Sequence, residues 1–168
     1  MPHPLGLSVD SGAKPMLSYE QLDVIADAYI PALAVGSLLL LAKRQAANGF
    51  HAAAPDIVYL FSAIATVYTL MFADRALKLW PYFHLDYSTH TALALVLVVF
   101  LAAAGTHMLA GTAVSMLAYI MLMIYQGYHS IADIVTTSMV LMPVILWLKT
   151  TGSDRLCRRW LLQKDAPL

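Results

Sequence analysis

Charged side chains are scarce in this sequence, and neither sign is in excess. Only 12% of the residues are charged, with ten Lys and Arg against ten Asp and Glu, whereas charged residues make up roughly 25% of an average soluble domain. A nucleic-acid-binding protein needs a surplus of cations to neutralise phosphates, so the balanced charge excludes nucleic acid as a partner. The scarcity of charge, beside 60% hydrophobic residues, indicates an integral membrane protein.

Cysteine is nearly absent as well. The single Cys157 has no partner within the chain, so disulfides take no part in the predicted fold. The sequence also lacks internal repeats, low-complexity tracts and linkers that would separate a second domain. We therefore expect one transmembrane catalytic domain at residues 21–150, an interfacial or mobile arm at 1–20 and a basic cytoplasmic tail at 151–168.

Long apolar runs, by contrast, are abundant. A spanning helix needs about 20 mostly apolar residues, with a range of roughly 17 to 25. Gly105 and Gly111 interrupt the apolar region after residue 104, which favours two helices over one long helix there. We predict an all-α bundle of about five transmembrane helices, of which the third is short. The predicted spans are Leu22–Leu41, Pro55–Phe72, Thr89–Ala104, Met108–Tyr125 and Ile131–Leu148.

Positive charge predicts the orientation of this bundle, because short loops rich in Lys and Arg stay on the cytoplasmic side. Lys43 and Arg44 lie in the first predicted loop, and further Lys and Arg residues lie in the segment 149–164. Both groups fall on one side only if the chain crosses five times, which puts the N-terminus outside and the C-terminus in the cytoplasm. Arg75 and Lys78, in an outer loop, are exceptions for which we expect a functional reason.

Two short motifs place ionisable residues at the outer ends of predicted spans. His90 opens the third span within DYSTHT, and YHSIAD opens the fifth with His129 and Asp133. Ionisable groups at membrane depth are costly and usually mark a functional site. His129 and Asp133 stand four residues apart, so on a helix the carboxylate can reach an imidazole nitrogen and fix the tautomer of the ring. The alternative is a structural pair that only ties two helices together.

The residues around these motifs are suited to binding phosphate. Ser88 and Thr89 are good N-cap residues, and the free amides and positive dipole end of a helix start bind anions. Arg75 and Lys78 add two cations from the adjoining loop. Two histidines can then transfer a phosphoryl group, because one can attack phosphorus while the other protonates the departing oxygen.

The two motifs resemble those of a known family. DYSTHTA is similar to the Ser-Gly-His motif, and YHSIAD to the His-x-x-x-Asp motif, of the type 2 phosphatidic acid phosphatase superfamily, whose membrane branch includes lipid phosphatases and sphingomyelin synthases. In that family the later histidine forms a phosphohistidine, the aspartate orients it, and the earlier histidine is the acid for the leaving group. The resemblance implies these roles for His129, Asp133 and His90, without a metal or another cofactor.

The chain departs from the family pattern in its cations. Thr89 stands where the first motif has glycine, and Leu122 and Met123 stand where the phosphatases carry a Ser-Arg pair. Arg75 and Lys78 are the nearest stand-ins for a further Lys…Arg-Pro motif. A phosphomonoester carries about two negative charges at neutral pH and normally needs several cations, whereas a diester carries only one. The resemblance is therefore nearest to the sphingomyelin-synthase-like group.

From these patterns we expect a membrane enzyme that cleaves a phospholipid head group through a phosphohistidine intermediate. The head group would pass to a lipid hydroxyl or to water, on the extracytoplasmic side of what the compact chain suggests is a bacterial inner membrane. Asp86, Tyr87 and Tyr128 are candidates for contacting the head group or supporting the site, since tyrosine faces can contact choline or ethanolamine. An aromatic belt at the membrane surface is the alternative for the tyrosines.

Three other functions remain open at this level. The first is a lipid phosphate phosphatase acting on phosphatidate, phosphatidylglycerophosphate or an isoprenoid phosphate. The second is a metal site, because His90, His129 and Asp133 form a set of two histidines and one carboxylate. The third is a non-catalytic lipid-binding membrane subunit. The pattern leaves the lipid, the acceptor and the oligomeric state undetermined.

Overall fold

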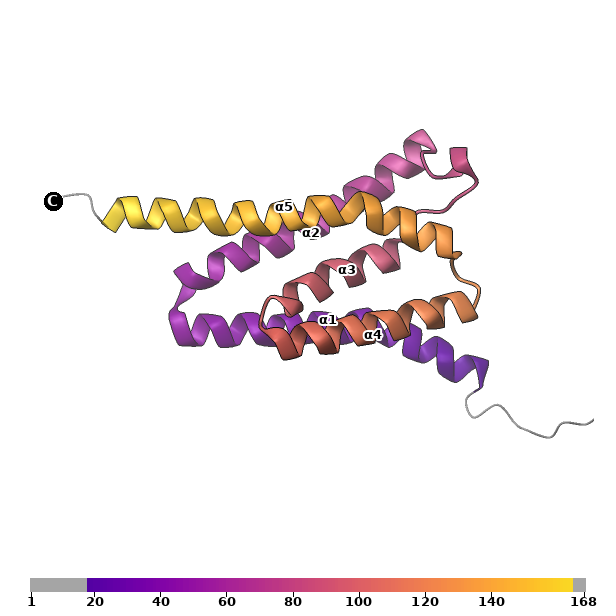
Figure 1. Ribbon diagram of the computed structural model, residues 1–168, viewed down its shortest axis with the longest axis horizontal. Helices are drawn as coiled ribbons and strands as arrows, with labels where there is room; N and C mark the ends of the chain where they lie inside the picture. Colours follow the sequence, from indigo (N-terminus) through magenta and orange to yellow (C-terminus); the bar gives the residue numbers. More distant parts are fainter. Residues whose placement is uncertain (1–17, 165–168) are drawn as a thin grey trace, which may run out of the picture.

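The described part of the chain is a bundle of antiparallel helices. The computed structural model describes the backbone of residues 18–164 and the side chains of residues 18–151. Successive α-helices run in opposite directions along the long axis of the molecule (Figure 1). The elements are α1 (Tyr19–Asn48), α2 (Phe50–Leu77), the 3₁₀ helix η1 (Pro81–Phe83), α3 (Thr89–Ala102), α4 (Thr106–Tyr125) and α5 (Ile131–Lys164).

Helix length and composition confirm the predicted membrane class. Four helices are long and apolar enough to cross a membrane, namely α1, α2, α4 and the part of α5 from Ile131 to Thr151. With 14 residues, α3 extends only about 21 Å, which is shorter than a bilayer hydrocarbon core of about 30 Å. The third of the five predicted spans is thus present as a short apolar helix.

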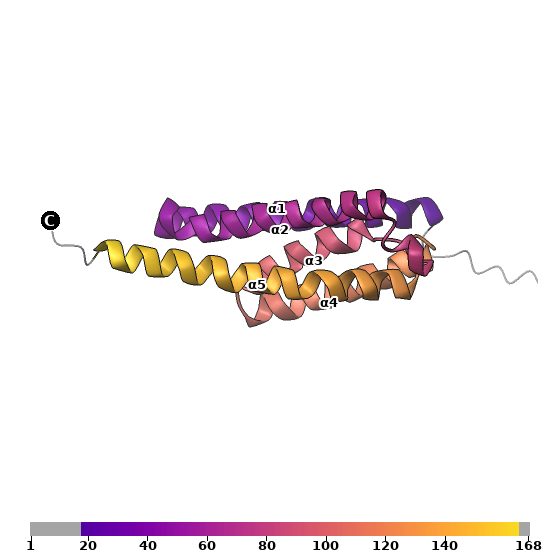
Figure 2. The same cartoon turned by 90° about the horizontal axis from the view of Figure 1, so that it is seen from above.

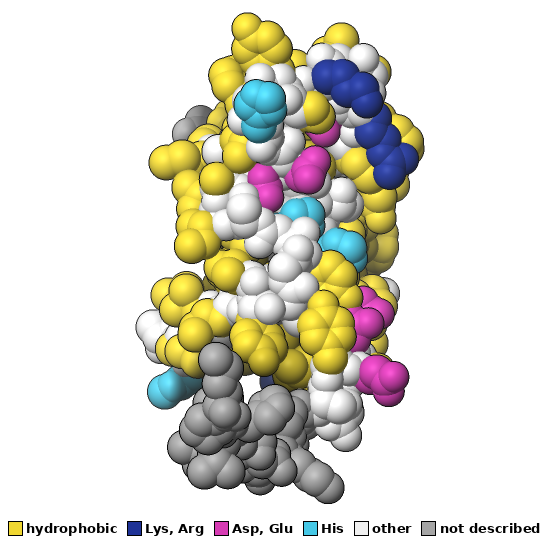
Figure 3. Space-filling view, turned by 90° about the vertical axis from the view of Figure 1, so that its right-hand side faces the viewer, with side chains coloured by type: hydrophobic (Ala, Val, Ile, Leu, Met, Phe, Trp, Pro, Cys, Tyr) yellow, Lys and Arg dark blue, Asp and Glu magenta, His cyan; other side chains and the backbone are white. Residues whose placement is uncertain are grey.

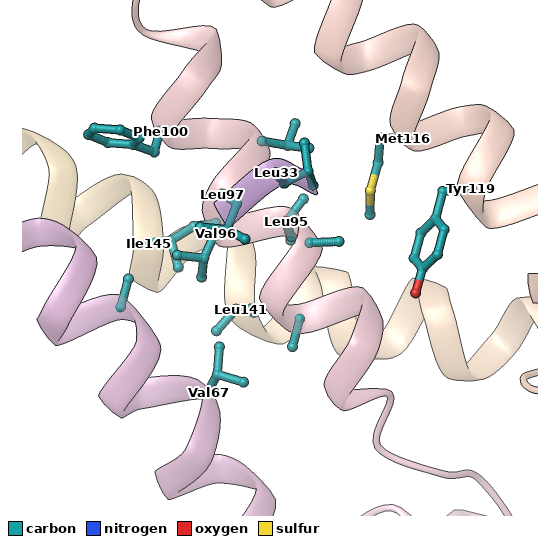
Figure 4. Close-up of a cluster of buried hydrophobic side chains, with 14 of the residues drawn as sticks. Leu33, Val67, Leu95, Val96, Leu97, Phe100, Met116, Tyr119, Leu141 and Ile145 are labelled. Atoms are coloured by element: carbon teal, nitrogen blue, oxygen red, sulfur yellow. The ribbon is translucent and has the colours of Figure 1, made fainter. Parts of the chain in front are cut away.

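α3 forms the centre of the bundle. Its sequence is apolar on all sides, as is typical of a helix that is buried all round, and it packs against each of the other four α-helices. The outer helices bury few side chains and expose many large apolar ones to the surroundings. Figure 4 shows buried side chains from all five α-helices meeting around α3: Leu33, Val67, Leu95, Val96, Leu97, Phe100, Met116, Tyr119, Leu141 and Ile145.

The ends of the helices agree with local signals in the sequence. Ser18 and Gln21 form a capping box at the start of α1. The predicted break after α3 is confirmed at Gly105, whose φ of 145° suits glycine and few other residues, while Gly111 lies inside α4. Of the predicted terminal segments, residues 1–17 and 165–168 lie outside the described residues.

A charged cluster joins three helices beside the C-terminal end of α3. Asp56 of α2 accepts from Arg44 of α1 over 2.5 Å and from Lys149 of α5 over 2.9 Å. The Lys149 ammonium also lies 4.8 Å from the centre of the Tyr59 ring and 5.0 Å from that of Phe100. Buried charges are tolerated when they are paired in this way, so the acid at this end of the bundle is satisfied by cations of neighbouring helices.

Candidate functional site

The other end of the bundle gathers the ionisable residues that the two motifs contribute. It is built from the end of α2, the loop of residues 78–88, the start of α3, the loop of residues 126–130 and the start of α5 (Figures 1 and 2). Figure 3 faces this end and shows acidic and histidine side chains close together, with basic side chains along one edge. The fold therefore brings the two distant motifs into one region.

His129 lies in the loop before α5 and not on the helix itself, because α5 begins at Ile131. Ser130 and Asp133 form a capping box at this start. The backbone N and Oγ of Ser130 donate to Oδ2 of Asp133 over 2.8 and 2.7 Å, and the backbone N of Asp133 donates to Oγ of Ser130 over 3.2 Å.

This cap corrects the predicted hydrogen bond between His129 and Asp133. A spacing of four residues brings side chains together only inside a helix, and the cap starts the helix two residues after His129. Nδ1 of His129 is buried and has no hydrogen-bond partner among the described residues. The same part of the chain has no group of three or more His, Cys, Asp or Glu side chains placed to hold a metal ion.

The start of α5 also holds the segment that leads into α3. Oδ1 of Asp133 accepts from the backbone N of Asp86 over 2.8 Å. One turn further along, Oγ1 of Thr137 accepts from the backbone N of Ser88 over 3.1 Å. These two bonds connect the motifs directly, so Asp133 positions both of the loops that carry candidate site residues.

His129 is half-buried, and its surroundings act on its charge in opposite directions. Desolvation by burial lowers the pKa of His129 below its ordinary value; Asp133 acts to raise that pKa, His90 to lower it and Asp86 to raise it. Burial prevails, so the ring is neutral at pH 7 to a greater extent than an ordinary histidine. A neutral imidazole offers the lone pair that a nucleophile needs. His90 is exposed in the first turn of α3, and its charge contributes to the electrostatic surroundings of His129.

A polar pocket of about 280 Å³ accounts for most of the remaining predicted residues. Arg75 and Lys78 both line it and are exposed, and neither forms an ion pair with any residue that the structure describes. Asp86 belongs both to this pocket and to the surroundings of His129, so the pocket and the histidine pair adjoin. The lining consists of Met71, Asp74, Arg75, Lys78, Pro81, Asp86, Tyr87 and Thr89.

The loop of residues 78–88 is shaped by contacts that the sequence analysis did not identify. Oδ1 of the buried Asp74 accepts from the backbone N of Trp80 over 2.8 Å, and Nε1 of Trp80 donates to Oγ1 of Thr136 over 3.2 Å. Lys78 ends α2 in the left-handed conformation, with a φ of 55°. An aspartate two residues after the predicted end of the second span, at Phe72, was the one available signal. These contacts hold both basic residues at the edge of the pocket.

Three predicted site residues have their polar atoms engaged elsewhere. Ser88 is the N-cap of α3, as predicted, but it is fully buried, and its Oγ donates to Oγ1 of Thr91 over 2.8 Å. The Tyr87 hydroxyl donates to the backbone O of Val67 over 3.2 Å, and burial together with the charge of Asp74 raises the pKa of Tyr87 to about 12. The third, Tyr128, donates to Asp23 of α1.

The other candidates remain available to a ligand. Arg75, Lys78, Asp86 and Thr89 share the pocket, and His90 and His129 lie beside it. Comparison of the chain with models of protein families, with curated proteins and with solved structures finds no match. The resemblance of the two motifs to a known superfamily therefore stays a prediction.

Proposed function

We propose that this protein is a membrane enzyme that transfers the phosphate-bearing head group of a lipid through a phosphohistidine on His129. The observation that carries the proposal is a half-buried His129, whose pKa burial lowers, near an exposed His90 and beside a pocket with two cations that have no ion-pair partner among the described residues. Neutral imidazole supplies a nucleophile, and cations stabilise the charge of a transferring phosphoryl group.

The proposed reaction has two steps. In the first, a ring nitrogen of His129 attacks phosphorus, the bond from phosphorus to the lipid oxygen breaks, and protonated His90 gives its proton to the departing alkoxide. In the second, an acceptor hydroxyl or water attacks phosphorus while His90 takes its proton and the bond to His129 breaks. Both histidines return to their starting states, as general acid–base catalysis requires.

The remaining polar residues bind and position. Arg75 and Lys78 are proposed to hold the non-bridging oxygens of the phosphate. The exposed carboxylate of Asp86 in the same pocket suits the cationic amine of a zwitterionic head group, which favours a phosphodiester lipid as substrate. Asp133 is a positioning residue, because its carboxylate holds the backbone of Asp86 and the start of α5.

The proposal includes five membrane crossings, with the site on the extracytoplasmic side of a bacterial inner membrane. Lys43, Arg44 and Lys149 lie toward the opposite end of the bundle. Positively charged residues near span ends favour the cytoplasmic side, so their position supports this orientation.

The test is turnover of defined lipids by the purified protein. Phosphatidylcholine, phosphatidylethanolamine and phosphatidate are each supplied with and without ceramide, and the products are identified by mass spectrometry. Diacylglycerol formed from the zwitterionic lipids supports the proposal, and diacylglycerol from phosphatidate alone, with free phosphate, makes the protein a phosphatase. No product from any lipid favours a non-catalytic lipid-binding subunit.

Histidine variants test the mechanism within the same assay. We expect His129→Ala to abolish both turnover and acid-labile labelling of the protein by a lipid with a radioactive phosphate. His90→Ala should slow release of the lipid alcohol. His84→Asn is the matched control, because His84 is an exposed histidine at the same end whose side chain makes no hydrogen bond to the described residues. Full activity of His129→Ala on every lipid would overturn the mechanism.

A further inference from the structure

An apolar groove of about 260 Å³ lies between α4 and α5. The two helices diverge from the loop of residues 126–130 that joins them (Figure 1), and the groove occupies the space between their facing sides near that loop. Among the residues whose side chains are described, Ser138 is the only polar one that lines it. The apolar lining comes from Ile120 and Ile124 of α4 and from Ile131, Ile134, Val135 and Met139 of α5.

The surroundings of the groove restrict what can occupy it. α4 and the first part of α5 are long and apolar enough to cross a membrane, and Val135 and Met139 are exposed on the surface of α5. Because both helices can cross a membrane, the groove is open to lipid, and it lacks the polar partners that ordered water needs. A hydrocarbon chain of the surrounding lipid matches this apolar lining.

The end of the groove leads to the proposed catalytic histidine. Ile131 lines the groove and lies two residues after His129, and Ile124 lies just before the loop that carries His129. A lipid whose chain runs along the groove toward this loop therefore has its polar part at the histidine pair and the adjoining pocket. The apolar groove would hold the acyl chain of a membrane lipid, and the polar site beyond its end would hold the head group.

We propose that the groove binds one acyl chain of the lipid substrate, which enters sideways from the membrane between α4 and α5. The identity of the head group rests on the proposed function, whereas acyl-chain binding can be measured without turnover. The groove selects for a single apolar chain of the substrate, and the polar pocket selects for its head group.

Photocrosslinking tests chain binding directly. The His129→Ala protein is reconstituted in phosphatidylcholine vesicles with a phosphatidylcholine that carries a diazirine in one acyl chain, and crosslinked residues are mapped by mass spectrometry. We expect crosslinks at Ile120, Ile124 and Val135 to exceed those at Phe61, which is exposed on α2 away from the groove. Equal labelling of the groove and of Phe61 would show ordinary membrane contact and overturn the inference.

A filling substitution separates this inference from the proposed chemistry. Val135→Trp should lower groove crosslinking several-fold in the His129→Ala background, and in the active protein it should slow long-chain lipids but spare a water-soluble short-chain ester. Met121→Trp, at an exposed position of α4 outside the groove lining, should change neither the crosslinking nor the turnover. Crosslinking in the groove without turnover of any lipid would support acyl-chain binding in the groove and contradict the proposed enzymatic function. If Val135→Trp leaves the turnover of long-chain lipids unchanged, acyl-chain binding in the groove is contradicted, but the proposed enzymatic function is not.

Discussion

Both ends of the bundle contain buried aspartates, but different groups hydrogen-bond to the carboxylates at the two ends. Beside the end of α3, both oxygens of Asp56 accept from the side chains of Arg44 and Lys149. At the other end, Asp74 and Asp133 accept from backbone N–H groups and a serine hydroxyl. The first arrangement uses cations to neutralise an acid. The second leaves nearby cations and histidines free to act on a ligand.

This difference explains why only one end is a candidate site. A carboxylate that is satisfied by N–H groups can stay ionised without a cationic partner, because such hydrogen bonds stabilise its charged form. Arg75 and Lys78 consequently remain at the pocket edge without an ion pair to the described residues. The opposite end is better suited to holding α1, α2 and α5 together.

The largest expected effect is on stability, at the end that holds the Asp56 cluster. Asp56→Ala would leave Arg44 and Lys149 without their partner, and removing one member of a buried ion pair costs about 3 kcal/mol. Thermal unfolding in detergent should show the loss, whereas Asp27→Ala, at an exposed position of α1, should have little effect. Equal stability of the two variants would mean that this cluster does not hold the helices together.

A smaller effect is expected on ligand binding, at the open end. Arg75→Gln or Lys78→Gln should each raise the KM for the lipid about tenfold, because a hydrogen bond to a charged group contributes about 1.5 kcal/mol. Stability should change little, since both side chains are exposed. Lys43→Gln, an exposed cation toward the other end, is the matched control. An unchanged KM in both pocket variants would remove these cations from the site.

A comparable but structural effect is expected from the capping box. Asp133→Ala removes the acceptor for the backbone N–H groups of Ser130 and Asp86, which should cost about 1 kcal/mol and loosen the loop of residues 78–88. Hydrogen exchange at Asp86 should accelerate, while exchange at the start of α1, which Ser18 caps, should not. Unaltered exchange at Asp86 would show that the loop is held by other contacts.

The smallest expected effect is a shift in the titration of His129. Its lowered pKa means that stability is fully present above the ordinary histidine range and declines as pH falls through the folded-state pKa. Asp86 acts to raise that pKa and His90 to lower it, so Asp86→Asn should lower the pKa and His90→Gln should raise it. Nuclear magnetic resonance titration of the labelled ring measures both shifts. His84→Asn should not shift the pKa of His129. Shifts of the opposite sign in the other two variants would contradict the placement of Asp86 and His90 around His129.

Local patterns in the chain predicted a large part of this structure. Apolar runs located the helices, Gly105 located the break after α3, and Ser88 was identified as a cap. The predicted hydrogen bond between His129 and Asp133 was wrong because it assumed that the helix includes His129. The competing cap by Ser130 decided where α5 starts, and sequence spacing alone does not rank such caps.

Periodicity and apolar length are properties of neighbouring residues, so the helical class, the membrane character and the association of both motifs with helix starts could be inferred from the chain alone. Pairing across the bundle depends on which helices adjoin. Only the packing around α3 brought Asp56 to Lys149, buried Ser88 and joined Asp86 to Asp133. Partners distant along the chain are selected by burial, because a polar group removed from water must take the donor or acceptor that packing places beside it.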